Sequence, residues 1–117
     1  MYIVLERLAD AGKAPAHMES HKAWLQKAFA DEVFFYVGGI HGGGGAAILA
    51  GEIATEDLLA RVNEDPFVAE GVVAPEIIEL DTTMSDPRLA FMVEFHGERL
   101  GYQAEPSGED GSSMGKD

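Results

Sequence analysis

The sequence contains no cysteine, which excludes disulfides, thiolate nucleophiles and zinc sites built on sulfur. It also lacks an apolar run of the roughly 18 residues that a membrane-spanning helix needs. The first residues carry no basic segment followed by a long apolar stretch, so no secretory signal is indicated. We therefore expect a cytoplasmic protein without a membrane partner.

Basic residues are also scarce. The 117 residues include 8 Lys and Arg against 21 Asp and Glu, which gives a formal net charge of −13. Proteins bind phosphate backbones mainly through Lys and Arg, so nucleic acid is not an expected partner. An acidic excess of this kind is typical of a solvated surface that keeps a small protein soluble.

The pattern of apolar residues predicts four strands and two helices. Residues 2–7, 33–37, 46–53 and 75–81 are short β-favouring runs bounded by turn residues. From Pro15 to Ala30 the apolar residues fall at helical spacing, and a second, shorter helix is predicted from Thr55, as its N-cap, to about Asp65. The stretch 38–45 holds six glycines in eight residues and predicts a flexible loop, in the role of a hairpin or lid.

The order strand, helix, strand, strand, helix, strand predicts an α+β, ferredoxin-like fold with one antiparallel sheet and both helices on one face. The other face needs a cover, so we expect a homodimer. We predict a domain over residues 1–83, a C-terminal extension over 84–102 that packs on the domain or the dimer partner, and a disordered acidic tail over 103–117.

Four histidines raise the question of a metal site. His17 and His21 stand four residues apart on the first predicted helix, a spacing that can place two imidazoles on one ion, with His41 or Glu52 completing the shell. The His-Glu-x-x-His pattern of zinc peptidases is absent, and such a pair is more often a surface feature. We therefore predict no metal ligands and no cofactor.

The glycine run does not indicate a nucleotide site either. Backbone N–H groups can cradle a phosphate, but the Gly-Lys-Ser/Thr ending of a phosphate-binding loop is absent from residues 38–45.

Two short segments carry the strongest indication of chemistry. The first contains His21 on the helix, followed by Leu25 and, after the next strand, by Gly38; the second is Asp65-Pro66-Phe67 with Gly71-Val72 behind it. An imidazole and a carboxylate are the material of a general acid/base pair if the fold brings them together.

In these segments, and in Ile77 of the last strand, the chain resembles the YCII-related group of small dimeric α+β proteins over about residues 2–82. Gly39 stands where that family usually has Pro, and Glu32-Val33 occupies a turn where a Gly is common. The resemblance implies a fold similar to muconolactone isomerases and other dimeric α/β barrels. It also implies a His-Asp pair in a cleft, with dehydrochlorination of a chlorohydroxyhydroquinone as the nearest chemistry.

On this resemblance the expected catalytic residues are His21 and Asp65. Asp65 would accept from one ring nitrogen of His21 and fix its tautomer, leaving the other nitrogen to move a proton on a small cyclic substrate. The expected substrate-binding residues are Ser20, Trp24, Tyr36, Gly38, His41 and Phe67.

Three functions stay open on the sequence. The first is a cofactor-independent lyase or isomerase that acts on an aromatic-derived or lactone-like small molecule. The second is a non-catalytic ligand-binding or dimerisation module, and the third is a haem- or metal-using member of the same barrel group.

Overall fold

A computed structural model describes residues 1–93 of the chain. The predicted acidic tail at 103–117 and the second part of the predicted extension, 94–102, lie outside these residues. The described elements, in chain order, are β1 (Tyr2–Leu8), the 3₁₀ turn η1 (Ala11–Lys13), α1 (Ala14–Ala30), β2 (Phe34–Gly39), β3 (Gly45–Ala50), α2 (Thr55–Asn63), α3 (Pro66–Ala69), β4 (Val73–Glu79), the 3₁₀ turn η2 (Pro87–Leu89) and α4 (Ala90–Val93).

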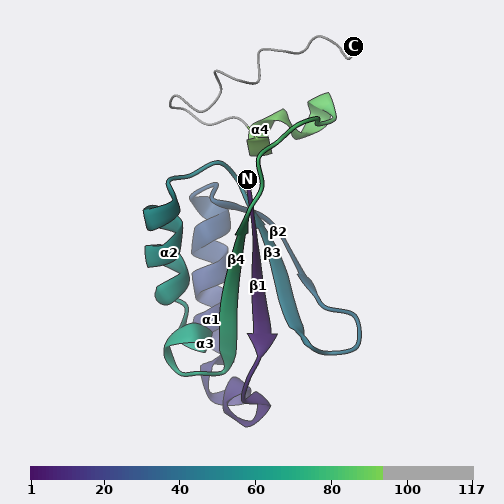
Figure 1. Cartoon of the computed structure of the whole chain (residues 1–117). Helices are drawn as coiled ribbons and strands as arrows, with labels where there is room; N and C mark the ends of the chain where they lie inside the picture. The colour runs from purple at the N-terminus through teal and green to yellow at the C-terminus, as the bar shows by residue number, and fades with distance from the viewer. Residues whose placement is uncertain (94–117) are drawn as a thin grey trace.

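The four strands form one sheet in the order β2-β3-β1-β4, and every neighbouring pair is antiparallel. Helices α1, α2 and α3 all lie on the same side of this sheet (Figure 1). The arrangement confirms the predicted α+β, ferredoxin-like fold. Pro75 lies in β4, the last strand of the sheet formed by residues 1–93, where a missing backbone N–H is tolerated because no described strand pairs with the outer side of β4.

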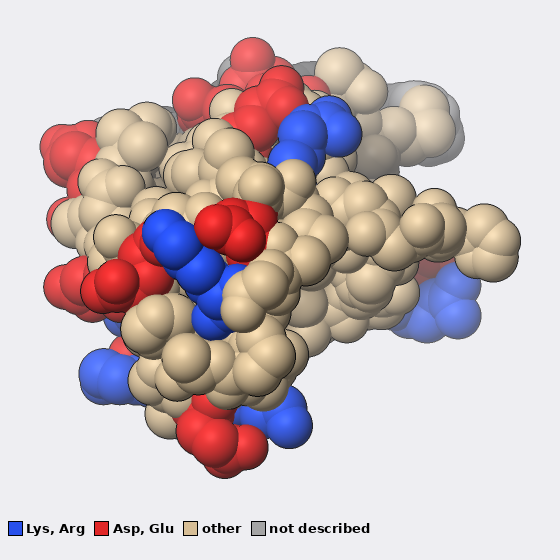
Figure 2. All heavy atoms as spheres, turned by 90° about the horizontal axis from the view of Figure 1, so that it is seen from below, with Lys and Arg blue, Asp and Glu red and all other residues tan. Residues whose placement is uncertain are grey.

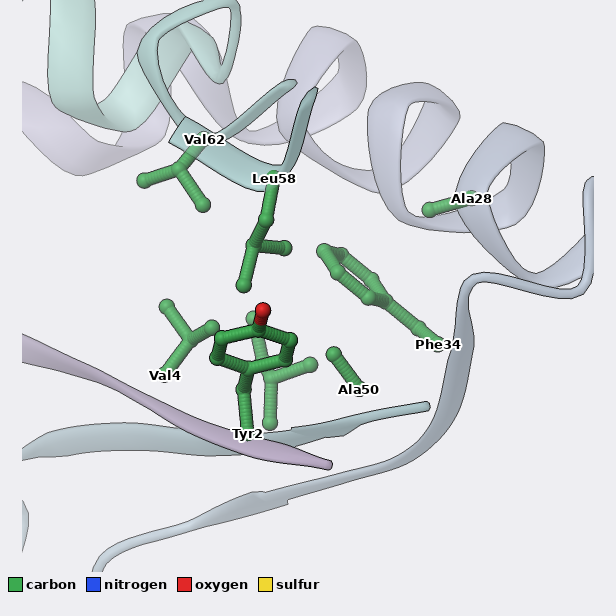
Figure 3. Packing of buried hydrophobic residues seen from close by; sticks show 8 residues of the cluster. Tyr2, Val4, Ala28, Phe34, Ala50, Leu58 and Val62 are labelled. Carbon is green, nitrogen blue, oxygen red and sulfur yellow. The ribbon is translucent and has the colours of Figure 1, made fainter. Parts of the chain in front are cut away.

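The core lies between the sheet and the helices. Alternate residues of β1 point toward the helices, so that Tyr2 and Val4 are buried there. Figure 3 shows them packed with Phe34 and Ala50 of the sheet and with residues of α1 and α2. The buried cluster consists of Tyr2, Val4, Ala28, Phe34, Ile48, Ala50, Leu58 and Val62.

The predicted N-cap of the second helix is wrong. Ala54 is the N-cap of α2, and no side chain caps that end. The Thr55 hydroxyl is instead 3.0 Å from the hydroxyl of Tyr2, which also donates to the carbonyl of Ile53 at 2.7 Å. The side chain of Thr55 therefore joins the start of α2 to the sheet.

The glycine run is more regular than the sequence indicates. Gly38 and Gly39 end β2, Gly45 begins β3, and residues 40–44 form the turn of a β-hairpin. Gly45 has φ +127°, and a Cβ built there would lie 2.0 Å from the carbonyl oxygen of Glu6. Only glycine allows this close approach of β3 to β1.

The chain beyond β4 returns to the domain. Met92 of α4 is buried, and the ring of Phe91 contacts that of Phe35 edge to face, with centroids 5.1 Å apart. This stretch begins the predicted extension, and its residues 90–93 are helical. Among residues 1–93, no helix has both the length and the apolar character needed to cross a bilayer.

Candidate active site

The centre of the site is a contact between α1 and the residue that precedes α3. His21 lies on the buried side of α1, and its Nδ1 is 2.8 Å from Oδ1 of Asp65. The Asp65 side chain is fully buried, and 11% of the His21 side chain is exposed. The two residues that the sequence singled out are therefore within hydrogen-bond distance.

Asp65 is held by the start of α3. It is the N-cap of that helix, and the same Oδ1 accepts from the backbone N–H of Phe67 at 2.9 Å. Pro66 occupies the first helical position, where its fixed φ suits a helix and its missing N–H costs no hydrogen bond. The sequence had placed this carboxylate at the end of the preceding helix; that helix ends at Asn63, and Asp65 begins the next one.

The other end of α3 is fixed by Gly71. Its φ is +75°, its N–H donates to Val68, and the N–H of Val72 donates to Phe67. These two bonds are a Schellman motif, which needs a left-handed residue at the glycine position. The Asp-Pro-Phe and Gly signals of the sequence are thus the two caps of one short helix that presents Asp65 to His21.

Two aromatic rings lie against the imidazole. Phe67 stacks on His21 with parallel planes, 2° apart, and a centroid distance of 3.9 Å. Trp24, one turn further along α1, is stacked at 5.9 Å, and its indole N–H donates to the carbonyl of Arg61. Trp24 and Phe67 therefore restrict the orientation of the His21 ring.

A third titratable group, Glu6, completes the cluster. Glu6 continues the inward row of Tyr2 and Val4 on β1 and is 1% exposed. One ligand atom from each of Glu6, His21 and Asp65 lies within 4.8 Å of the others. Glu6 is not among the site residues predicted from the sequence. Its place two residues beyond Val4 in the alternation was the available signal.

The two carboxyl groups have opposite pKa shifts. Burial raises the pKa of Glu6 to about 9, and the neighbouring Asp65 adds to the effect through a side-chain hydrogen bond and charge repulsion. Burial also acts to raise the pKa of Asp65, but hydrogen bonds with His21, Glu6 and the Phe67 backbone outweigh it and leave that pKa below its ordinary value. Near neutral pH the cluster therefore holds a neutral Glu6 beside an ionised Asp65.

This arrangement defines the chemistry open to His21. An ionised Asp65 can only accept, so Nδ1 of His21 carries the proton and Nε2 carries the lone pair of a neutral ring. Nε2 can then accept a proton from a bound molecule and return it. The same three residues offer one imidazole nitrogen and two carboxylates, a donor set that also suits a divalent transition metal.

The other expected binding residues are spread over the fold. Ser20 is exposed on α1, and its hydroxyl donates to the carbonyl of His17. Tyr36 pairs with Leu49, which places Tyr36 on the sheet face that carries no helices, and Gly38 lies on that same face. His41 is exposed in the turn of the hairpin. Of the expected binding residues, Trp24 and Phe67 contact His21.

The surroundings of the site are mixed in charge. Figure 2 looks at the end of the molecule near α3 and the hairpin, where Lys and Arg side chains lie among Asp and Glu. A cavity of about 520 Å³ lies elsewhere, next to the end of α1, and is lined by Asp31, Glu32, Val33, Phe35, Gly51, Glu52, Ile53 and Phe91. This cavity does not include His21 or Asp65.

Comparison with solved structures shows a distant fold relationship. The structure resembles that of 5-chloro-2-hydroxyhydroquinone dehydrochlorinase from Burkholderia phenoliruptrix AC1100, solved in complex with 2,5-dihydroxybenzoquinone. The TM-score is 0.55 and the sequence identity 17%, over 69% of this chain and 94% of that one. No protein-family model and no curated protein matches the chain. The comparison defines the class of the protein as a small α+β domain of ferredoxin-like fold.

Proposed function

We propose that this protein is a small enzyme of the YCII-related type, in which His21 moves a proton on a small cyclic or aromatic-derived metabolite without a cofactor. The observation that carries the proposal is the 2.8 Å contact between Nδ1 of His21 and Oδ1 of Asp65. The fold relationship to a dehydrochlorinase supports it. The reaction would be that of a lyase, an isomerase or a dehydrochlorinase.

The chemical step uses Nε2 of His21. As a general base, Nε2 takes a proton from a hydroxyl or carbon of the substrate, and the released electron pair moves through the ring system. In an elimination such as dehydrochlorination, the leaving group departs with its bonding electrons, so no oxidant or reductant is needed. In an isomerisation, the imidazolium returns the proton to another atom. Asp65 stabilises the imidazolium because it already accepts from Nδ1.

The sheet beside the cluster supports a planar substrate. The cross-strand row that contains Glu6 continues through Ala46 to Gly39, and these small residues leave the backbone of the sheet uncovered by large side chains. Ala46 is half-buried and Gly39 is exposed. We propose that a flat ring lies on this row, near the hairpin turn that carries His41. Gly39, where the YCII-related proteins usually have Pro, belongs to this surface.

We further propose that the protein acts in the cytoplasm as a homodimer, joined through the sheet face without helices. One cross-strand row on that face runs Ile78, Ile3, Leu49, Tyr36 and is apolar across all four strands. Ile78 is 36% exposed and Tyr36 57%. A second copy packed face to face would bury this row, as two sheets do in a sandwich.

A non-catalytic ligand-binding module is the second candidate, and a specific observation favours it. The His21–Asp65 pair is largely buried, and the cavity of about 520 Å³ lies apart from it. In that case His21 would stabilise the packing of α1 on α3, and small molecules would bind without being converted.

Calorimetric titration and turnover assays separate these candidates. Hydroxylated quinones and chlorinated hydroquinones form the panel, with 2,5-dihydroxybenzoquinone as the first probe. We expect conversion of at least one panel member by the wild-type protein and a loss of about 10²-fold or more in His21→Ala, the usual contribution of a general base. His17→Ala, one turn earlier on α1, is the matched control and should retain activity. Equal rates in wild type and His21→Ala would overturn the proposal, and binding without conversion would support the module.

A further inference from the structure

Glu6 is a buried acidic group without a basic partner from Lys or Arg in the described part of the chain. Its side chain faces His21, which lies on α1, and Asp65, which is the N-cap of α3. Its cross-strand neighbours are Ala46 on β3 and Pro75 on β4, neither of which is charged. An isolated carboxylate in such a place would be strongly unfavourable, so its charge must be removed or compensated.

Two buried oxygens in this cluster indicate how the charge of Glu6 is removed. Oε2 of Glu6 and Oδ2 of Asp65 are both buried without a hydrogen-bond partner from another group among residues 1–93. An oxygen of the Glu6 carboxyl group lies within 4.8 Å of an oxygen of Asp65, and a hydrogen bond between the two side chains contributes to both of their pKa shifts. A single proton between them therefore satisfies both oxygens and removes one of two adjacent negative charges.

The proton belongs to Glu6. Oδ1 of Asp65 receives two donors, Nδ1 of His21 and the N–H of Phe67, and both favour the ionised form of Asp65. No such donor to Glu6 is found among residues 1–93. The pKa of Glu6, raised to about 9, agrees with this assignment.

We propose that Glu6 is a positioning residue of the site: its neutral carboxyl group donates a hydrogen bond to Oδ2 of Asp65 and holds that carboxylate with Oδ1 toward His21. This role rests on the proposed function of His21 as an acid/base group. The resulting chain runs from Glu6 through Asp65 to Nδ1 of His21. Ionisation of Glu6 would repel Asp65 and withdraw the hydrogen bond that fixes its second oxygen.

A divalent cation between the two carboxylates is the competing explanation of the same geometry, because it would also compensate both charges. The structure favours the proton, since Nδ1 of His21 is already engaged by Oδ1 at 2.8 Å and is directed at that oxygen. With its proton on Nδ1, His21 has no lone pair at that nitrogen to offer a cation held between the carboxylates.

The test is carbon NMR of protein with ¹³C-labelled glutamate side chains, with Glu6→Gln to assign the signal. We expect the Glu6 carboxyl at pH 7 to have the shift of a protonated acid and to titrate near pH 9, with no change on adding EDTA, Mg²⁺, Mn²⁺ or Zn²⁺. An ionised Glu6 at pH 7 would overturn the proposal, and so would bound metal found in the purified protein by elemental analysis. These readouts need no turnover, so the outcome is independent of the panel assay above.

Rescue separates positioning from a merely structural role. Gln keeps a donor in the place of the Glu6 carboxyl, so Glu6→Gln should keep the Nδ1–H tautomer of His21 and lose the titration near pH 9. Glu6→Ala has no donor and should lose the single tautomer, as read from the imidazole ¹⁵N shifts. If Glu6→Ala keeps the wild-type shifts, Glu6 does not position the pair. If activity is absent while Glu6 is protonated and fixes the tautomer, only the proposed function fails.

Discussion

Nδ1 of His21 and Oδ1 of Asp65 lie 2.8 Å apart although 44 positions separate the two residues in the sequence. The contact joins the middle of α1 to the N-cap of α3. Phe67 supports both partners, because its backbone N–H donates to Asp65 and its ring stacks on His21. The Asp-Pro-Phe segment therefore acts as one unit, which caps a helix and orients an imidazole with the same three residues.

Replacement of Asp65 by Ala should destabilise the fold markedly. It removes a helix cap, a loss of about 1 kcal/mol, and leaves buried polar groups of His21 and Glu6 without a partner, a further loss of about 1 to 3 kcal/mol. Chemical denaturation measures the free energy of unfolding. Asp86→Ala is the control, because Asp86 caps the exposed turn η2 through the N–H of Arg88 and should cost less. Equal losses in the two variants would contradict a coupled cluster.

The stability of the protein should depend on pH through Glu6. Its pKa is about 9 in the folded state against 4.5 as the ordinary value, so between these pH values the folded chain binds more protons than the unfolded one. The free energy of unfolding of the wild type relative to Glu6→Gln should therefore fall as pH rises from 4.5 to about 9, by at most about 1.4 kcal/mol per pH unit. Denaturation curves at a series of pH values check this, and a difference that does not vary with pH would contradict it.

Asp65 should also make the free energy of unfolding depend on pH, but with the opposite sign to Glu6 and only at acid pH. Its pKa is lowered from 3.8, so its contribution to stability is complete above that value and is lost as pH falls through the lowered pKa. Acid denaturation of the wild type and Asp65→Asn should converge at the lowest pH values. A gap between the two curves that stays constant down to the acid limit would argue against this shift.

Gly45→Ala should destabilise the protein by at least about 2 kcal/mol, because its left-handed φ and a Cβ at 2.0 Å from the carbonyl oxygen of Glu6 both oppose a side chain. The matched control is Gly39→Ala in the same hairpin. There the nearest atom is 3.9 Å from the added Cβ, and the change should stay within about 0.5 kcal/mol. Thermal unfolding measures both, and similar losses would show that β3 does not need its close approach to β1.

A charge on the sheet face without helices should disrupt the proposed homodimer. Leu49 lies in the apolar row of that face, so Leu49→Glu should give the mass of one chain by light scattering where the wild type gives that of two. Leu59→Glu, on the exposed surface of α2, should leave the mass unchanged. A wild-type protein with the mass of one chain would contradict the dimer.

The fold was predictable because the apolar residues of its main strand and helix recur at the regular spacing of those elements. The alternation of residues 2–7 and the helical spacing of residues 15–30 define β1 and α1, and the order of elements then leaves few topologies. The contact between His21 and Asp65 was predicted through the resemblance. Neither residue alone carries enough local information to indicate it.

The remaining parts of the site depend on details that a linear pattern does not contain. Tyr36 would share a face with Phe34 in a regular strand, but a bulge between them turns Tyr36 to the opposite face. Glu6, followed by Arg7, has the local pattern of a strand end that enters solvent, and only the packing of α1 and α3 over that end buries it. Burial of a carboxyl group is a tertiary property.

The ¹⁵N chemical shifts of the His21 ring, from a long-range ¹H–¹⁵N spectrum, decide whether Nε2 of His21 is available as the base. We predict that Nδ1 of His21 carries the proton and that the lone pair of the uncharged ring is on Nε2, and that this single tautomer is lost in Asp65→Asn. A wild-type His21 with its proton on Nε2 would contradict the account, because Nε2 could then not act as the base.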